Sequence, residues 1–206
     1  TQAGVRTLLA GGNAVDAAIA ANAVLNVVEP MSNGLGGDLF ALVYWAADRR
    51  VYGLNASGRA PYAATLEALL QRGCSQAGGI PTRGMLAVTV PGEPAGWADL
   101  HARFGALAWE SVLAPAIAYA TQGFPVSELI ARDWQGCTSL LRREAEAARV
   151  FLPGGRAPRA GERFVNPDLA SSLRALAEDG PDVFYRGRIA QAIAAASLRR
   201  KGLLAA

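Results

Sequence analysis

The sequence predicts a layered α/β or α+β domain, and two observations carry this prediction. A helix of small apolar residues is expected between Asn13 and Glu29, and such a helix is normally buried against a sheet. A hairpin follows, with strands over 39–45 and 51–54. This order favours helix and sheet layers over a helical bundle. The chain has 206 residues, of which 51% are hydrophobic and 18% charged, so it can bury a sizeable core.

The N-terminal region has clear helix start and stop signals. A first helix is expected over 2–10, and it should end at Gly11-Gly12 because glycine is a usual C-terminal stop. Asn13 is expected to cap the second helix. Asp16, three residues later, can serve the free backbone N–H groups at the positive helix end. The second helix should end at Glu29-Pro30.

The hairpin lies between two turns rich in glycine and polar residues. The first covers 33–38 (NGLGGD) and the second covers 55–61 (NASGRAP). Glycine permits close approach of the backbone to a ligand, which would make this a binding edge. Tight turns also need glycine when nothing binds, and a glycine-rich loop is a weak signal. Spacing leaves both interpretations open.

The rest of the chain is expected to be mainly short helices and loops within one domain, since no repeat, low-complexity tract or clean linker divides residues 1–206. One further strand is predicted over 85–90, and Pro115 should kink its helix or mark its first turn. Loops are expected over 73–83, 91–96 and 152–163. Helices are expected over 62–70, 97–104, 111–120, 127–134, 140–148, 169–178 and 189–198.

Composition argues against several classes of function. The net charge is only +3 and the basic residues are scattered, so no nucleic-acid partner is expected. No apolar run reaches the ~20 residues that span a bilayer, so no membrane partner is expected. Cys74 and Cys137 have no neighbours at metal-ligand spacing, and free thiols are favoured over a disulfide. The single histidine, His101, is expected at a surface or capping position. That the chain has no other histidine argues against a histidine triad or a His-rich zinc site within it.

Six segments of the chain, taken in order, resemble the γ-glutamyltransferase (γ-glutamyltranspeptidase) family. A single glycine motif would be a weak signal, but six segments in register are a strong one, and they cover nearly the whole chain. They are GGNAVDAA (11–18), EP (29–30), GLGGDLF (34–40), VPGEPAGW (90–97), APAIAYA with GF (114–124), and FVNPDLA with FYRG (164–187).

The resemblance implies an α+β fold of the N-terminal-nucleophile hydrolase type, with αββα layers, of which residues 1–206 form a single partial domain in the large subunit. In this family a precursor cleaves itself, and the new N-terminal threonine of the small subunit is both nucleophile and, through its amine, base. It takes the γ-glutamyl group from glutathione or related amides, and water or an amino acid then receives it. The implied partners are that small-molecule γ-glutamyl or acyl-amide substrate and the small subunit of the same precursor. No cofactor is implied, and homo-oligomerisation stays open.

No catalytic residue is expected inside this chain, because the resemblance assigns the nucleophilic threonine to a position beyond Ala206. Thr1 has the type of a nucleophile, but it leads into a helix that belongs to the start of the family's large subunit. The other threonines considered (Thr65, Thr82, Thr89 and Thr121) have no better claim. The fragment alone is therefore expected to be inactive. Localisation stays open between periplasmic or secreted and cytoplasmic.

The candidate substrate-binding residues are Ser57 and Arg59. In the family, the arginine of an Arg-x-x-Ala-Pro pattern pairs with the α-carboxylate of the glutamyl group, and an arginine fork suits a carboxylate. Here the segment 57–61 reads SGRAP, so Ser57 stands at the arginine's position and Arg59 follows two residues later. Two residues along a strand keep the same face. The alternative is that Arg59 forms a structural salt bridge or binds backbone carbonyls.

The combination of Gly36-Gly37-Asp38 with SGRAP resembles a divergent branch of the family that includes cephalosporin (glutaryl) acylase-like members. The acyl group is therefore open between γ-glutamyl and glutaryl types, and a non-catalytic scaffold with the same fold is a third alternative. Asp38 could contact a substrate ammonium or cap a turn. Glu93 and Asp16 are expected to be structural.

Overall fold

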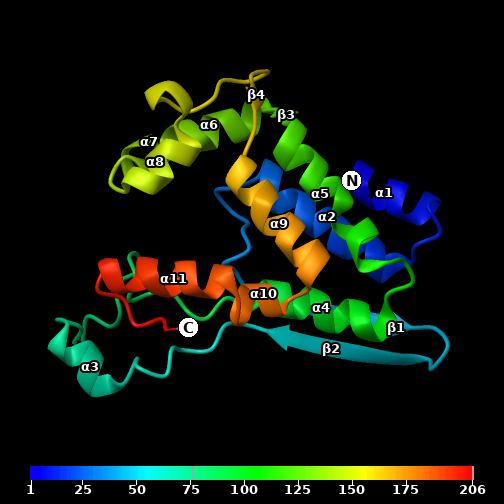
Figure 1. Cartoon of the computed structure of the whole chain (residues 1–206). Coiled ribbons are helices and arrows are strands. Elements are labelled where there is room, and N and C mark those ends of the chain that lie inside the picture. Colours follow the sequence, from blue (N-terminus) through cyan, green and yellow to red (C-terminus); the bar gives the residue numbers. More distant parts are fainter. Residues whose placement is uncertain (76, 206) are drawn as a thin grey trace. The chain divides into compact units, whose positions relative to one another are not determined.

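The computed structural model describes residues 1–75 and 77–205, and these form two compact units (Figure 1). Unit 1 comprises Thr1–Gly34 and Phe104–Glu178, and unit 2 comprises Leu35–Arg103 and Asp179–Ala206. Each unit therefore combines segments that lie far apart in the sequence.

Unit 1 is mainly helical, with one very short sheet. Strands β3 (Phe124–Pro125) and β4 (Arg163–Phe164) pair antiparallel, with Phe124 opposite Phe164. The helices are α1 (Gln2–Leu9), α2 (Ala14–Val28), α5 (Trp109–Gln122), α6 (Glu128–Gly136), α7 (Thr138–Leu141), α8 (Ala145–Phe151), the 3-10 turn η1 (Pro153–Gly155) and α9 (Pro167–Asp179).

The core of unit 1 is centred on α2. Ala20 and Ala23 are completely buried, and Ile19 and Val27 are nearly so. Within unit 1, α2 packs against the helices α1 and α5. Its small residues let these helices approach closely. A Cβ placed on Gly4 of α1 would lie 3.2 Å from the carbonyl oxygen of Ala17 on α2.

The start of α2 confirms the predicted cap. Asn13 Oδ1 accepts hydrogen bonds from the N–H groups of Val15 and Asp16, at 2.8 and 3.1 Å. Asp16 Oδ2 in turn accepts from the Asn13 N–H at 2.9 Å, which completes a capping box. The Asp16 carboxylate is fully buried and also accepts from the N–H groups of Ala106 and Leu107. Its expected structural role is thus confirmed.

Unit 2 is built on the predicted hairpin. Strand β1 (Leu39–Trp45) pairs antiparallel with β2 (Arg50–Ala56), with Leu39 opposite Ala56 and Trp45 opposite Arg50. Helix α4 (Glu93–Phe104) contacts the hairpin through Gly96, where a Cβ would come within 2.7 Å of the side chains of Leu39 and Ala56. The remaining helices of the unit are α3 (Leu66–Gln71), α10 (Asp182–Tyr185) and α11 (Arg188–Arg199).

One predicted strand is wrong. Residues 85–90 form no strand in the structure. The segment has β-forming residues, but a strand also needs a neighbour to complete its ladder. Within the described residues, its one backbone hydrogen bond to a distant segment runs from the Val90 N–H to the Arg59 carbonyl, at 2.9 Å.

Several predicted helices have different bounds. Helix α4 begins at Glu93 rather than at 97, because Pro94 fits the first turn, where its missing N–H costs nothing. Helix α3 begins only at Leu66, after Thr65, whose hydroxyl accepts from the Ala68 N–H at 3.1 Å. The helix predicted over 140–148 is divided between α7 and α8. The elements α10, β3 and β4 were not predicted, since they are too short to show a periodic pattern.

Both cysteines are free thiols, as predicted. Among the described residues, no helix combines the length and apolar character needed to cross a bilayer. The same residues contain no group of three or more His, Cys, Asp or Glu side chains that could hold a metal ion.

Candidate functional site

A cavity of about 420 Å³ lies in unit 2, at the C-terminal end of strand β2. One wall is formed by residues 54–60, where β2 ends and the SGRAP segment begins, together with Tyr62. The other wall is formed by residues 90–92 and by Ala95, Gly96 and Asp99 from the first turns of α4. Figure 1 shows the end of β2 beside the start of α4. The volume falls in the range of small-molecule sites, roughly 300–1,000 Å³.

Two glycines let the two walls approach each other closely. A Cβ on Gly58 would collide with the Val90 carbonyl oxygen and would lie 2.5 Å from the Thr89 hydroxyl. A Cβ on Gly92 would collide with the Ala56 carbonyl oxygen. Neither glycine has a positive φ, so close packing rather than backbone conformation requires them here.

Hydrogen bonds hold the SGRAP segment to the turn before β1. Asp38 Oδ1 accepts from the Gly58 N–H at 2.7 Å, so this carboxylate joins two segments that lie 20 positions apart in the sequence. The Gly37 carbonyl accepts from the N–H groups of both Gly92 and Glu93, at 3.0 Å each. The two glycine-rich edges of the hairpin and the start of α4 thus form one connected framework.

Tyr185 of α10 stabilises the second wall through two hydrogen bonds to the backbone of that wall. Its hydroxyl donates to the Pro91 carbonyl at 2.8 Å and accepts from the Ala95 N–H at 3.0 Å. Burial raises the pKa of Tyr185 above its usual value, the hydrogen bond from Ala95 opposes this, and the nearby carboxylates of Glu93 and Asp99 add to it. The hydroxyl therefore stays protonated at neutral pH and keeps its donor role.

The structure brings both sequence-predicted site residues, Ser57 and Arg59, to this one cavity. Both are exposed. The Arg59 carbonyl accepts from the Val90 N–H at 2.9 Å, which fixes the backbone from which the side chain extends. Within the described residues, the Arg59 guanidinium forms no ion pair and no hydrogen bond, so neither the salt bridge nor the carbonyl contact considered for it occurs there.

Asp99 is a lining residue that sequence reasoning missed. It is exposed, and the described residues provide no ion-pair partner for its carboxylate. A signal was present, because Gly92, Ala95, Gly96 and Asp99 follow the i, i+3, i+4, i+7 spacing of one helix face. Predicting the start of the helix at Trp97 hid that face. The cavity thus has one cationic and one anionic side chain, on different walls.

The described lining residues include no threonine, cysteine or histidine. Thr1 precedes α1 in unit 1 and is not among them. These lining residues can therefore bind and orient a ligand with charged groups.

Comparison with known proteins gives a consistent picture. The Gamma-glutamyltranspeptidase family model matches residues 1–206. Over 194 residues the chain is 42% identical to the Glutathione hydrolase-like YwrD proenzyme of Bacillus subtilis, covering 94% of this chain and 36% of that protein. Over 203 residues it is 40% identical to the Oxamate amidohydrolase proenzyme of Klebsiella pneumoniae, covering 94% of this chain and 37% of that protein.

A solved structure of cephalosporin acylase from Bacillus halodurans superposes with a TM-score of 0.92 at 42% identity, covering 99% of this chain and 38% of that one. The chain thus spans little more than a third of the length of these relatives. The structural match confirms the predicted fold class, the partial αββα fold of N-terminal-nucleophile hydrolases. The family model and the six motifs agree along the whole chain, and the chain belongs to the γ-glutamyltranspeptidase family.

Proposed function

We propose that the protein containing this chain cleaves γ-glutamyl amides by hydrolysis or acyl transfer, and that its unit 2 cavity holds the acyl group. The observation that carries the proposal is the unpaired Arg59 guanidinium in a small-molecule-sized cavity that also contains Asp99. The 206-residue chain alone is expected to be inactive, because the proposed nucleophile belongs to another part of the precursor.

The charges of the cavity match those of a γ-glutamyl group. Such a group carries an α-carboxylate and an α-ammonium on the same carbon, at the end opposite the scissile amide. Arg59 is suited to the carboxylate because its planar fork can donate two parallel hydrogen bonds, and the Ser57 hydroxyl can add a third. Asp99 is suited to the ammonium. Two charged contacts at one end of the substrate would fix the direction in which the amide points.

The contribution of these residues to the reaction is to bind and orient the substrate. A threonine hydroxyl from the small subunit would attack the amide carbon while its own amine accepts the proton. The leaving amine would then depart, and water or an amino acid would receive the acyl group. Holding the acyl chain in one orientation converts this attack into an effectively unimolecular step. The names of the relatives from Bacillus subtilis and Klebsiella pneumoniae, both proenzymes, support a precursor that is cleaved into subunits.

A second candidate is an amidohydrolase for acyl groups that lack the α-ammonium, such as glutaryl amides. Two observations favour it. The chain is 42% identical to the cephalosporin acylase of Bacillus halodurans, the same figure as for the glutathione hydrolase-like relative. In the family pattern the arginine stands at the position that Ser57 occupies here. In this chain the arginine follows two residues later, as Arg59. A glutaryl amide keeps the terminal carboxylate, so Arg59 would serve both substrates, whereas Asp99 would serve only the γ-glutamyl one.

The test compares two chromogenic substrates on the full-length protein, γ-glutamyl-p-nitroanilide and glutaryl-p-nitroanilide. The γ-glutamyl proposal requires cleavage of the first compound. Cleavage of the glutaryl compound alone would establish the second candidate instead. Cleavage of neither compound by a correctly folded protein would favour a non-catalytic scaffold.

Two variants test the proposed contacts. Arg59→Ala should lower kcat/KM by about 10- to 100-fold on either carboxylate-bearing substrate, mostly through KM, because it removes hydrogen bonds to a charged group. Asp99→Asn should lower kcat/KM for the γ-glutamyl substrate by about tenfold and leave the glutaryl substrate unaffected. Arg72→Ala is the matched control, since the one hydrogen bond of its side chain in the described part of the chain goes to the Ala68 carbonyl of α3. An Arg59→Ala variant as active as this control would rule out Arg59 as a carboxylate ligand.

A further inference from the structure

Unit 1 contains a second cavity, of about 560 Å³, which the proposed function does not use. It lies between α6, α7 and the segment 156–160, which leads toward β4. Four arginines from these separate segments line it: Arg132, Arg142, Arg156 and Arg159. One acidic residue, Glu128 in the first turn of α6, also lines it.

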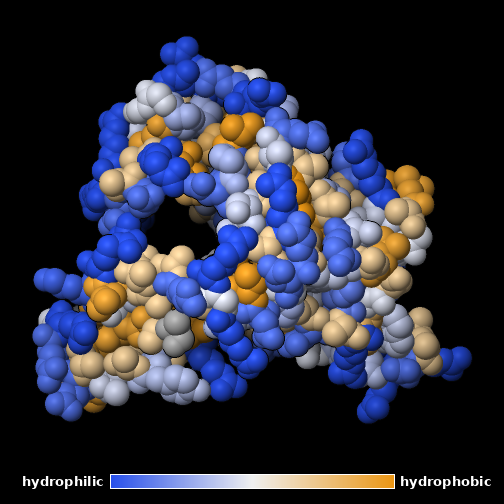
Figure 2. Space-filling view, in the orientation of Figure 1, coloured by the Kyte–Doolittle hydropathy of each residue, from blue (hydrophilic) through white to orange (hydrophobic). Residues whose placement is uncertain are grey.

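Most of the apolar lining is buried and the charged lining is exposed. Ala131, Ala157 and Pro158 are buried, whereas Ala160 and the four arginines are exposed. Figure 2 shows hydrophilic residues over the segment that precedes β4. The cavity therefore combines an apolar floor with a cationic rim.

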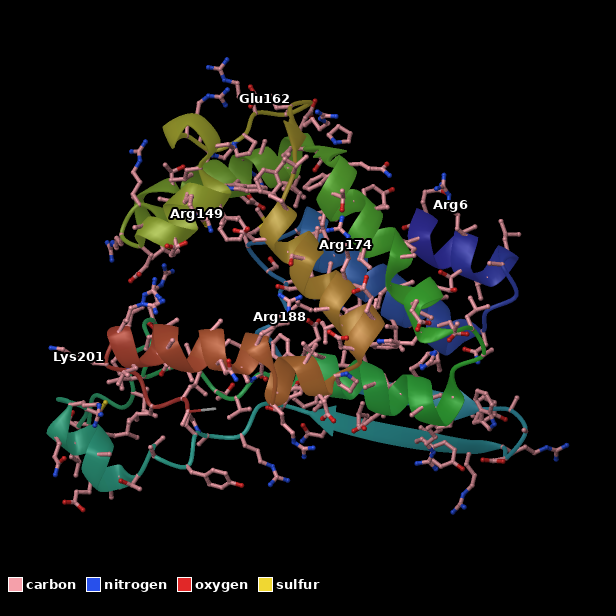
Figure 3. The ribbon with its side chains drawn as sticks, viewed as in Figure 1. Arg6, Arg149, Glu162, Arg174, Arg188 and Lys201 are labelled. Atoms are coloured by element: carbon pink, nitrogen blue, oxygen red, sulfur yellow. The ribbon has the colours of Figure 1, made fainter. Side chains whose placement is uncertain are left out.

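Arg156 already forms an ion pair within the protein. Its guanidinium makes two parallel hydrogen bonds with the carboxylate of Glu162, at 2.8 Å each. The Arg159 N–H also donates to Glu162, at 2.8 Å. These contacts lower the pKa of Glu162 to about 2, first through the Arg156 hydrogen bond and then through the Arg159 N–H, so the carboxylate stays ionised at neutral pH. Glu162 is labelled in Figure 3, next to the start of β4.

The charges of Arg142 and Arg159 are not neutralised in this way. Arg142 Nη2 donates to the Gly155 carbonyl at 3.0 Å, which positions the guanidinium but leaves its charge uncompensated. The Arg159 side chain forms no ion pair among the described residues, although its charge acts on Glu162 from a longer distance and its backbone N–H donates to that carboxylate. Arg132 contacts its neighbour Asp133 at 3.2 Å, but with 73% of its side chain exposed that pair is weak.

We propose that this cavity is a binding site for a small anion that carries two or more phosphate or carboxylate charges, held by Arg142 and Arg159 with support from Arg132. Guanidinium forks match both oxyanion types, and two of them from separate segments can grip two anionic groups at once. Gln135 and Thr138, which also line the cavity, add neutral donors. Arg156 holds the segment in place through Glu162 rather than binding the anion itself.

Isothermal titration of the full-length protein with tripolyphosphate and, separately, with citrate tests the proposal and distinguishes the two sources of charge. Saturable one-to-one binding of at least one of these anions is expected. The binding should weaken from about 50 to about 200 mM NaCl, because added salt screens exposed charges. Absence of saturable binding by both anions at the lower salt concentration would overturn the proposal.

Three single variants and a charge-matched control make the test specific. Arg142→Ala and Arg159→Ala should each raise Kd by about tenfold, and Glu128→Gln should lower Kd because it removes the opposing negative charge. Arg186→Ala is the control. It removes the same charge from the residue that follows α10. Among the residues that the structure describes, Arg186 pairs with Asp182 alone, at 3.5 Å, and its side chain is 82% exposed. Equal losses in the control and the cavity variants would show non-specific attraction to net charge and refute the site. Thermal unfolding by circular dichroism checks that each variant is folded, and the tightening by Glu128→Gln cannot arise from misfolding.

Discussion

Replacement of Gly92 by alanine tests how strictly the walls of the unit 2 cavity depend on close backbone approach. A Cβ at this position would overlap the Ala56 carbonyl oxygen. It would also lie 2.8 Å from the Ala56 carbonyl carbon and 3.3 Å from the Gly58 nitrogen. All three atoms belong to the backbone, so no rotation of a side chain can relieve the overlap. The change must therefore push α4 away from the end of β2.

The loss of unfolding free energy caused by Gly92→Ala depends on how the added methyl group can be accommodated. An extra methyl group in a well-packed region typically costs about 1–3 kcal/mol. The upper half of that range, about 2–3 kcal/mol, is expected for Gly92→Ala because the obstacle is backbone. The same displacement also disturbs the hydrogen bond from the Gly92 N–H to the Gly37 carbonyl.

Gly36 provides a matched control in the same unit. A Cβ on Gly36 would meet no atom within 4 Å, and its φ is not positive. Gly36→Ala should therefore be neutral or stabilising, by up to about 1 kcal/mol, through the reduced freedom of the unfolded chain.

Urea unfolding of the two variants, followed by circular dichroism, measures the difference, and KM for γ-glutamyl-p-nitroanilide reports on the cavity. Gly92→Ala should lose both stability and affinity relative to Gly36→Ala. Equal unfolding free energies for the two variants would refute the close approach of α4 to the end of β2.

Two further predictions concern carboxylates. Asp16→Asn should cost about 2–3 kcal/mol of unfolding free energy, because it replaces a buried charged acceptor of several N–H groups. Asp48→Asn removes an exposed carboxylate that accepts a hydrogen bond from Tyr52 and should stay within about 0.5 kcal/mol of the parent. Equal costs of the two variants in urea unfolding would contradict the role of Asp16. Glu162 has a folded pKa of about 2 against an ordinary 4.5, so its stabilising effect is complete above pH 4.5 and is lost as the pH falls through 2. Unfolding of Glu162→Gln across this range should converge with the parent at low pH and diverge above it.

Local signals explain the parts of the fold that could be predicted. The Asn13 cap, the hairpin strands and the free cysteines depend on residues close in sequence or on composition, and all three were predicted correctly. The strand predicted over 85–90 fails for the opposite reason. Its residues favour extended backbone, but pairing depends on a neighbour elsewhere in the chain. Propensity alone carries no information about whether that neighbour is present.

The same distinction separates the predicted from the missed residues of the unit 2 cavity. Ser57 and Arg59 could be identified because they occupy one short motif. Tyr185 could not, because it reaches Pro91 and Ala95 from a segment 90 or more positions away in the sequence. Asp99 is an intermediate case. The spacing of the residues around it indicates its helix face, but only the position of the hairpin shows that this face lines a cavity.

The presence of Arg59 therefore does not by itself identify the acyl group that the cavity binds. Gly58 and the Val90–Arg59 hydrogen bond keep the SGRAP segment against the second wall, so the cavity contains a cation although Ser57 stands at the position that the resemblance assigns to the arginine. Because γ-glutamyl and glutaryl groups both end in a carboxylate, a retained cation does not distinguish between them. They differ in the α-ammonium, and the charged lining residue suited to an ammonium is Asp99. The choice between the two substrate classes should thus follow the response to Asp99→Asn. A variant that loses γ-glutamyl cleavage but keeps glutaryl cleavage would identify Asp99 as the residue that reads the acyl group.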